Sequence, residues 1–216
     1  MPAIYLVRHG QASFGSENYD VLSPTGQLQA SIVGKELVRR GVRAPIFGCG
    51  TLSRQRETAT IAAVEFGVAR PEFVVDSRWN EFDAHGLVDR WLDTPGISTS
   101  MTSSEFQIHL DKAFTAWIEG TDGSWDEFSS GAFGALVDFI AQIPRGSDGI
   151  VVTSAGVTAA VAGRFFSTDA AGVVALNRVG INTAITSILS GSSGLNLLTF
   201  NDHAHVIGCE GMLTTR

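Results

Sequence analysis

An arginine and a histidine stand side by side at positions 8 and 9, directly after the apolar run 3–7. A short run of apolar, aromatic and β-branched residues predicts a buried strand, so both side chains are expected at its carboxyl end. Open α/β sheets bind ligands at that edge. The forked donors of Arg8 can hold an oxyanion, and the imidazole of His9 can attack the electrophile that the arginine holds. The pair therefore predicts chemistry on a phosphoryl group.

Three more polar side chains follow later predicted strands. Arg54 comes after the strand predicted at 46–49, at the start of a helix, where free N–H groups and the positive end of the helix dipole favour an anion. Glu81 follows the strand at 73–75, and Ser154 follows the strand at 149–153. Because the carboxyl ends of parallel strands meet at one edge, we expect a phosphate pocket that contains a nucleophile and an acid.

Strand-like and helix-like segments alternate along the chain. Predicted strands cover 3–7, 46–49, 73–75, 149–153, 182–189 and 195–200, and predicted helices cover 24–40, 54–66, 128–143 and 157–166. The Gly-Ser-Ser-Gly segment 191–194 joins the last two strands as a hairpin. This order predicts an α/β fold, a three-layer α/β/α sandwich with a mostly parallel sheet and one antiparallel edge strand.

The stretch from about 84 to 131 differs in character from the rest of the chain. It places aromatic residues at helical spacing among Ser, Thr, Gly and acidic residues. With 216 residues, of which 44% are hydrophobic, the chain is long enough to bury a sizeable core. We therefore expect a single domain over 1–216 with a helical cap inserted at about 84–131.

Charge and composition exclude several classes of protein. The net charge of −7 argues against a nucleic-acid or membrane-surface binder, because such proteins need clustered Lys and Arg. The amino terminus lacks a basic segment followed by an apolar one, and no apolar run is long enough to cross a bilayer, so a cytoplasmic protein is expected. The only two cysteines, Cys49 and Cys209, are expected to be reduced thiols.

Metals, cofactors and oligomerisation complete these expectations. His203 and His205 beside Asp202 could present a metal face, but such spacing alone is a weak signal, so we predict no metal and no cofactor. The sequence does not determine the oligomeric state, although a homodimer is compatible with it. The expected partner is a small phosphorylated substrate.

Several segments together resemble a known family. They are Arg8-His9-Gly10-Gln11, the segments 22–30 and 52–59, and Glu81. In order and spacing they are similar to successive signatures of the histidine phosphatase superfamily, the phosphoglycerate mutase-like proteins. The resemblance implies that His9 takes the phosphoryl group, that Arg8 and Arg54 clamp its oxygens, and that Glu81 donates a proton to the leaving oxygen.

The physical chemistry of these side chains agrees with the implied roles. His9 must be neutral to attack, and two nearby guanidinium groups would disfavour its protonation. Glu81 would be most useful as an acid in a partly apolar setting that raises its pKa, although Asp83 is a close alternative. Gln11 and Ser13, beside the nucleophile, are candidate phosphate-binding residues, and the alternative is that they point to solvent.

Two positions depart from the pattern of the family. Ser154 stands where the resemblance implies a second phosphate-binding histidine, and Gly50 stands where serine is common. A serine hydroxyl can donate one hydrogen bond but carries no positive charge. Two interpretations of Ser154 stay open, a phosphate-binding residue and a structural turn residue. Loss of a pre-organised donor typically costs about a hundred- to a thousandfold in rate.

The composition of the cap bears on the substrate. Between Glu81 and Ile140 the sequence has eleven carboxylates against two cations, Arg90 and Lys112, which suits a second anionic group on the substrate poorly. All four tryptophans lie in or beside this region (Trp79, Trp91, Trp117 and Trp125). They indicate either an apolar leaving group or the small core of the cap itself.

The sequence thus predicts a metal-independent phosphatase that acts on a phosphate monoester through a phosphohistidine. Two alternatives remain. One is a mutase, which the acidic cap disfavours. The other is a regulatory protein that binds a phosphorylated ligand and has lost efficient catalysis, with Ser154 as the residue that separates it from the phosphatase.

Overall fold

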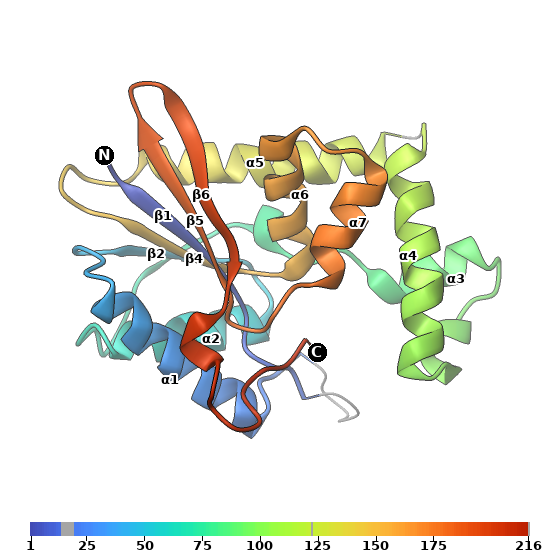
Figure 1. Cartoon of the computed structure of the whole chain (residues 1–216), viewed down its shortest axis with the longest axis horizontal. Coiled ribbons are helices and arrows are strands. Elements are labelled where there is room, and N and C mark those ends of the chain that lie inside the picture. The colour runs from blue at the N-terminus through green and yellow to red at the C-terminus, as the bar shows by residue number, and fades with distance from the viewer. Residues whose placement is uncertain (14–19, 122, 216) are drawn as a thin grey trace.

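The structure of the protein is a computed structural model that describes residues 1–13, 20–121 and 123–215 (Figure 1). At its centre lies a six-stranded sheet with the strand order β3-β2-β4-β1-β5-β6. The strands are β1 (Ala3–Arg8), β2 (Ile46–Cys49), β3 (Phe73–Val75), β4 (Gly149–Thr153), β5 (Ile185–Gly191) and β6 (Gly194–Asp202). The first four run parallel, whereas β5 is antiparallel to both β1 and β6. The predicted α/β class is confirmed.

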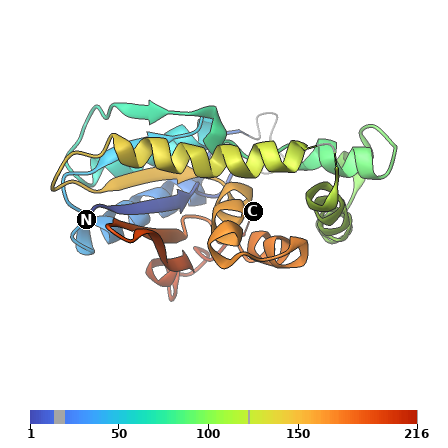
Figure 2. The ribbon, with the colours of Figure 1, turned by 90° about the horizontal axis from the view of Figure 1, so that it is seen from above.

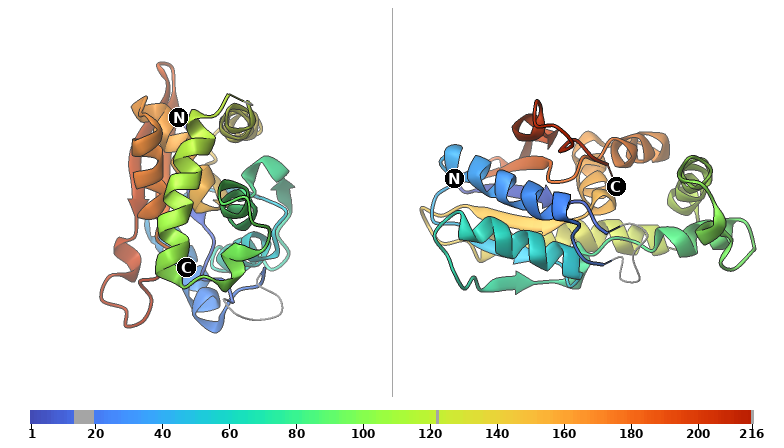
Figure 3. Two further views of the ribbon diagram at one scale, coloured as in Figure 1. Left: turned by 90° about the vertical axis from the view of Figure 1, so that its right-hand side faces the viewer. Right: turned by 90° about the horizontal axis from the view of Figure 1, so that it is seen from below.

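Helices cover both faces of the sheet. They are α1 (Pro24–Arg39), α2 (Ser53–Val64), α3 (Ala84–Trp91), α4 (Ser103–Glu119), α5 (Ser124–Ala141), α6 (Ala155–Phe166) and α7 (Ala170–Arg178). On one face α1 and α2 pack against Phe47, Ile150 and Val152 (Figure 3, right). On the other, α5 and α6 pack against Ile4 and Val151. The predicted three layers are therefore present.

Two glycines bring the end of β1 against the start of α1. Ser23 caps α1, because its side chain accepts a hydrogen bond from the Gly26 N–H at 3.0 Å, and Pro24 opens the first turn. A Cβ on Gly10 would collide with the Gly26 carbonyl, and a Cβ on Gly26 would collide with the Gln11 backbone. This contact between two backbones fixes the residues after β1.

Several boundaries differ from the sequence prediction by one to four residues, as in α5, which begins at Ser124 rather than at 128, and two of the differences lie near the ends of β4 and β1. Helix α6 begins at Ala155 rather than at 157, and β5 begins at Ile185 rather than at 182. Thr183 has a φ of 60°, in the left-handed region, which an extended strand cannot contain. Asn182 and Thr183 instead form a buried turn that hydrogen-bonds to the backbone after β1.

Helix α7 is absent from the predicted elements. It has only nine residues, and its start is marked by Asp169, whose side chain accepts a hydrogen bond from the Gly172 N–H. A helix this short is marginal by itself. Packing of Val173 and Val174 against the cap stabilises it, and this contact is visible only in the folded protein.

Helices α3 and α4 lie at one end of the molecule, beyond the sheet (Figure 1), and contribute to a second, smaller core. Leu87 and Val88 of α3, Leu110 and Phe114 of α4, and residues of α7 form it. Helix α5 runs from the sheet to this end, as Figure 2 shows. The cap boundary predicted at 131 falls inside α5, so the division of the chain at that residue stays a prediction.

No helix in the part of the chain that the structure describes is both long enough and apolar enough to cross a membrane.

Phe139 provides a test of the main core. Its side chain is 1% exposed and lies against the backbone of β2 and β4 at Gly48 and Gly149. We expect Phe139→Ala to lower the free energy of unfolding by about 3–5 kcal/mol, because the cavity cannot collapse against backbone. Chemical denaturation measures this change. Val137→Ala, on the exposed side of the same helix, is the control and should change stability by less than about 0.5 kcal/mol.

Candidate active site

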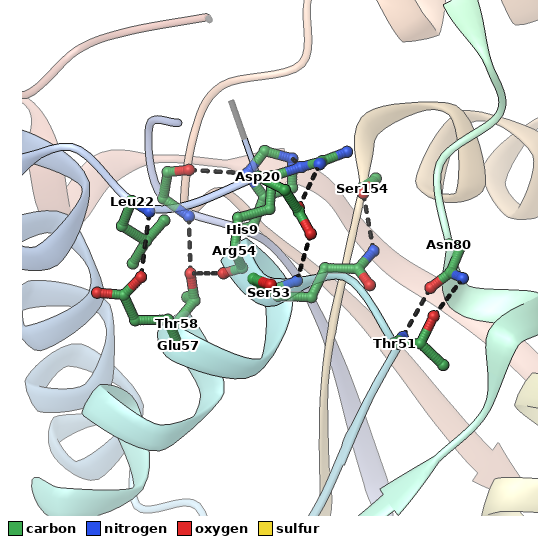
Figure 4. A network of polar contacts seen from close by, with 12 residues as sticks. His9, Asp20, Leu22, Thr51, Ser53, Arg54, Glu57, Thr58, Asn80 and Ser154 are labelled. Atoms are coloured by element: carbon green, nitrogen blue, oxygen red, sulfur yellow. Dashed lines mark hydrogen bonds and ion pairs between the residues drawn. The ribbon is translucent and has the colours of Figure 1, made fainter. Parts of the chain in front are cut away.

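The imidazole of His9 is held by one acceptor and one donor. His9 directly follows β1, is 5% exposed, and its backbone N–H donates to the Thr153 carbonyl of β4. Its Nδ1 lies 2.7 Å from the Gly10 carbonyl oxygen, so Nδ1 carries the proton and donates it. The Arg54 Nε–H donates to Nε2 at 3.1 Å (Figure 4). The lone pair of His9 is therefore on Nε2, beside Arg54.

This environment keeps His9 neutral. Burial lowers the pKa of His9 well below its usual range, and the positive charges of Arg8 and Arg54 lower it further. The hydrogen bond to Gly10 has the opposite effect but is weaker. A neutral imidazole with a directed lone pair is the form that can act as a nucleophile.

Arg54 lies in the first turn of α2 and binds a carboxylate from a different segment. Its Nη1 is 2.6 Å from Asp20 Oδ1, and the Ser53 N–H donates to Asp20 Oδ2 at 2.8 Å (Figure 4). The capping residue Leu52 offers no side-chain acceptor, so Asp20 satisfies this helix start. Asp20 was not among the predicted site residues. An anionic group thus already lies on the two donors that sequence reasoning assigns to a phosphate.

Arg8 lies close enough to two titrating groups to influence both. Its Nη1 donates to the Gly180 carbonyl at 2.7 Å. Its charge lowers the pKa of His9 and opposes the rise in the pKa of Glu81. The structure therefore brings Arg8, His9, Arg54 and Glu81 into one site, as expected for the ends of β1, β2 and β3.

The carboxyl of Glu81 lies at the start of α6. Both of its oxygens accept from the Gly156 N–H, at 3.1 and 3.2 Å, and Oε1 also accepts from the Phe82 N–H at 3.3 Å. Burial raises the pKa of Glu81 and outweighs these hydrogen bonds and the charges of the two arginines. The raised pKa favours the protonated form of Glu81, which can act as a proton donor. Asp83, the alternative candidate for the acid, instead caps α3, where its side chain accepts a hydrogen bond from the Gly86 N–H.

The other predicted phosphate-binding residues have their own partners. Ser154 is fully buried, and its Oγ accepts from Gln55 Nε2 at 2.8 Å. Gln11 Oε1 accepts from the Ser23 hydroxyl at 2.8 Å, toward the start of α1. Ser13 lies farther along the same loop, where its N–H donates to the Val21 carbonyl. Phosphate binding by Gln11, Ser13 and Ser154 stays a prediction.

Two residues that hold the backbone around His9 were not predicted. The Thr58 hydroxyl donates to the Arg54 carbonyl at 2.7 Å and accepts from the Gly10 N–H at 3.0 Å, which joins α2 to the loop after β1. The Asn182 amide donates to the His9 carbonyl at 3.1 Å. Thr58 lies within the recognised segment 52–59, but nothing in the sequence pairs Asn182 with position 9.

The tryptophans serve mainly as core residues. Trp79 is fully buried in the main core, whereas Trp117 and Trp125 pack in the core of the cap. Trp91 is 46% exposed. A cavity of about 140 Å³ in the cap is lined by Phe82, Asp83, Leu87, Arg90, Trp117 and Ser124. Of the two interpretations of the tryptophans, the cap-core one therefore holds for Trp117 and Trp125.

Within the described ranges, no three His, Cys, Asp or Glu side chains are grouped so that they could hold a metal ion. His205 is mostly buried near Arg40, and both burial and that charge lower its pKa to about 4.

Comparisons with known proteins identify the family of the chain. The family model "Histidine phosphatase superfamily (branch 1)" matches residues 4–203. The chain belongs to this superfamily. A phosphoglycerate mutase of Candida albicans is 40% identical over 68 residues, a match that spans 29% of this chain and 27% of that protein.

Solved structures share the fold at low sequence identity. The mycobacterial glucosyl-3-phosphoglycerate phosphatase is 19% identical, with a TM-score of 0.66 over 94% of this chain and 99% of that one. A variant of the Entamoeba histolytica phosphoserine phosphatase, in complex with phosphoserine, is 17% identical, with a TM-score of 0.66 over 95% of this chain and 100% of that one.

Asp20 should compete with phosphate for Arg54 and the Ser53 N–H. We expect Asp20→Asn to bind inorganic phosphate or vanadate about tenfold more tightly, because a charge-assisted contact worth about 1.5–3 kcal/mol no longer opposes the ligand. Isothermal titration calorimetry measures this affinity. Asp93→Asn is the matched control, since Asp93 is exposed and Asn also tolerates its φ of 49°. Unchanged or weaker binding by Asp20→Asn contradicts the competition.

Glu81 should make stability depend on pH in one direction. Its pKa in the folded protein lies above its unfolded value of 4.5, so its contribution is full below about pH 4 and is lost as pH rises through the folded pKa. Glu81→Gln lacks this loss. Its Tm should therefore rise relative to the wild type between about pH 4 and pH 7. Glu127→Gln, which removes an exposed carboxylate of α5, is the control, and a Tm difference independent of pH would disprove the assignment.

Proposed function

We propose that this protein is a metal-independent phosphatase that hydrolyses a phosphate monoester through a phosphohistidine on His9. The observation that carries the proposal is the hydrogen-bonded state of His9. Its Nδ1 proton is donated to Gly10, and its Nε2 lone pair is next to Arg54 in a buried site. Membership of the superfamily supports phosphoryl transfer at this residue.

Substrate binding requires the phosphoryl oxygens to replace the Asp20 carboxylate. Arg54 and the Ser53 N–H, which now bind Asp20, would then hold two of these oxygens, and Arg8, whose charge also acts on His9, would stabilise the phosphoryl group as the second guanidinium. A loose, metaphosphate-like transition state depends mainly on positioning and on stabilisation of charge. Two guanidinium groups and a helix start supply both.

In the first step, the Arg54 Nε–H turns from His9 Nε2 to a phosphoryl oxygen, the freed lone pair of Nε2 attacks phosphorus, and the bond from phosphorus to the ester oxygen breaks. The leaving oxygen takes the proton of the Glu81 carboxyl and departs as an alcohol. In the second step, Glu81, now a carboxylate, takes a proton from water, whose oxygen attacks the phosphohistidine. The P–N bond breaks, Nε2 regains its lone pair, and inorganic phosphate is released.

Hydrolysis is favoured over a mutase reaction by the charge of the cap. A mutase must bind a second anionic group of its substrate. The segment from Glu81 to Ile140 contains only two cations but eleven carboxylates, so it offers few positive charges for such a group. Two structural neighbours are phosphatases named for small phosphorylated substrates, phosphoserine and glucosyl-3-phosphoglycerate. We propose a substrate of this general size with a phosphate monoester as its reacting group.

Trapping the intermediate tests the proposal. The protein is mixed with an aryl phosphate, quenched rapidly at alkaline pH and digested, and mass spectrometry locates the added phosphate. We expect it on His9, and we expect His9→Ala to lose both the adduct and at least about a thousandfold of the turnover rate.

Controls and other outcomes separate the alternatives. His109→Ala, in the cap helix α4, should leave adduct and turnover unchanged. Transfer of the trapped phosphate to a second substrate rather than to water would identify a mutase. Phosphate binding without adduct or turnover would identify a binding protein and overturn the phosphatase assignment.

A further inference from the structure

Gln55, the residue after Arg54 in α2, carries an amide that no part of the mechanism above uses. The side chain is fully buried. Its Nε2 donates two hydrogen bonds, one to the Trp79 carbonyl and one to Ser154 Oγ, both at 2.8 Å. Both amide protons are therefore used, and they join α2 to two other segments of the chain.

One of those segments carries Glu81, and the other binds its carboxyl. Trp79 lies two residues before Glu81, and Ser154 lies two residues before Gly156, whose N–H binds the Glu81 carboxyl. The Trp79 carbonyl also accepts from the Thr153 hydroxyl at 2.7 Å, so β4 is tied to the same point. Gln55 thus connects the proton donor, the N–H that binds it, and the helix that begins with Arg54.

The other end of the amide fits only because position 50 is a glycine. A Cβ on Gly50 would collide with Gln55 Oε1 and with Asn80 Oδ1. Asn80 cannot easily move away, because its Oδ1 accepts from the Thr51 N–H and its Nδ2 donates to the Thr51 hydroxyl, both at 2.7 Å. Gln55 Oε1 itself is buried and has no hydrogen-bond partner among the described residues.

A small residue at position 154 is required for the same reason. Ser154 Oγ is already at hydrogen-bond distance from Gln55 Nε2, so a longer side chain extending from position 154 along this direction would occupy the place of the amide. Positions 50 and 154 are the two at which this sequence departs from the pattern of the family it resembles. Both of these positions therefore lie against the side chain of Gln55.

We propose that Gln55 is a positioning residue that holds Glu81 in register with Arg54, and that the small residues at positions 50 and 154 make room for it. The role of Glu81 as proton donor rests on the proposed function, but the positioning of its carboxyl does not. Loss of the amide frees the segment that carries Glu81, so water reaches the carboxyl and its ionised form becomes easier to form.

The titration of Glu81 tests this directly. Carbon-13 NMR follows its side-chain carboxyl against pH in wild type and in Gln55→Met, with Glu81→Gln supplying the assignment. Methionine keeps the length of the side chain and removes both donors. We expect the pKa of Glu81 to fall toward its ordinary value in Gln55→Met and to stay unchanged in Gln142→Met, an exposed glutamine of the same chain.

Kinetics give a second readout. For an aryl phosphate, Gln55→Met should lower kcat by about ten- to a hundredfold and move the basic limb of its pH profile to lower pH, while KM changes little. A residue that only stabilises the fold would lower the Tm without moving the limb. An unchanged Glu81 titration in a folded Gln55→Met protein overturns the proposal.

Gly50→Ala is an independent variant that displaces the amide without removing it, and it serves if Gln55→Met does not fold. We expect the same shift of the Glu81 titration, and we expect Gly50→Ala combined with Gln55→Ala to titrate as Gln55→Ala alone does, because the collision with Gln55 Oε1 is then gone. A further shift in the double variant would assign the effect of Gly50→Ala to its collision with Asn80 and overturn the role of position 50 as space for Gln55. If the variants shift the Glu81 titration but the wild-type protein has no phosphatase activity, the positioning by Gln55 is supported and the proposed function is overturned.

Discussion

The site depends on keeping one imidazole neutral inside a cationic pocket. Among the described residues, the imidazole of His9 has one donor and one acceptor, the Arg54 Nε–H and the Gly10 carbonyl, and both are fixed by the fold. Gly10 is held by the contact with Gly26 and by the Thr58 hydroxyl, and Thr58 also binds the carbonyl of Arg54. His9 and Arg54 are therefore positioned by the same few hydrogen bonds between α2 and the end of β1.

Burying two guanidinium groups close together requires compensation. Removing a charge from water costs several kcal/mol unless hydrogen bonds or an opposite charge offset it. Arg54 finds a carboxylate in Asp20, and Arg8 donates to the Gly180 carbonyl. Glu81 also lies in the field of both arginines, yet its burial dominates and raises its pKa. The site thus raises the pKa of one carboxyl and lowers the pKa of the neighbouring imidazole.

The secondary structure and the polar residues at the strand ends could be predicted from local sequence patterns. The residues that hydrogen-bond to these polar residues or to the segments that carry them could not. Alternation of strands with helices, the Ser23 cap and Arg54 at a helix start are encoded in short segments. Arg8, His9, Arg54 and Glu81 therefore lie at the edge of the sheet where the sequence predicts them. Asp20, Gln55 and Asn182 act over long sequence separations. Their partners lie 34, 99 and 173 residues away, and no local period reports such contacts. Helix α7 escaped prediction for the same reason, because tertiary packing stabilises it.

Helix α5 has a mechanical consequence. Its 18 residues form one continuous helix about 27 Å long, with Phe139 in the main core and Trp125 in the core of the cap. Because α5 packs in both cores, a tilt of the cap also tilts the end of α5 that packs against the sheet. The cap therefore cannot rotate as a hinged lid unless a turn of α5 unfolds or the sheet moves with it. In the proposed phosphatase, the choice of substrate would consequently depend on which side chains α3 and α4 present rather than on the motion of a hinge.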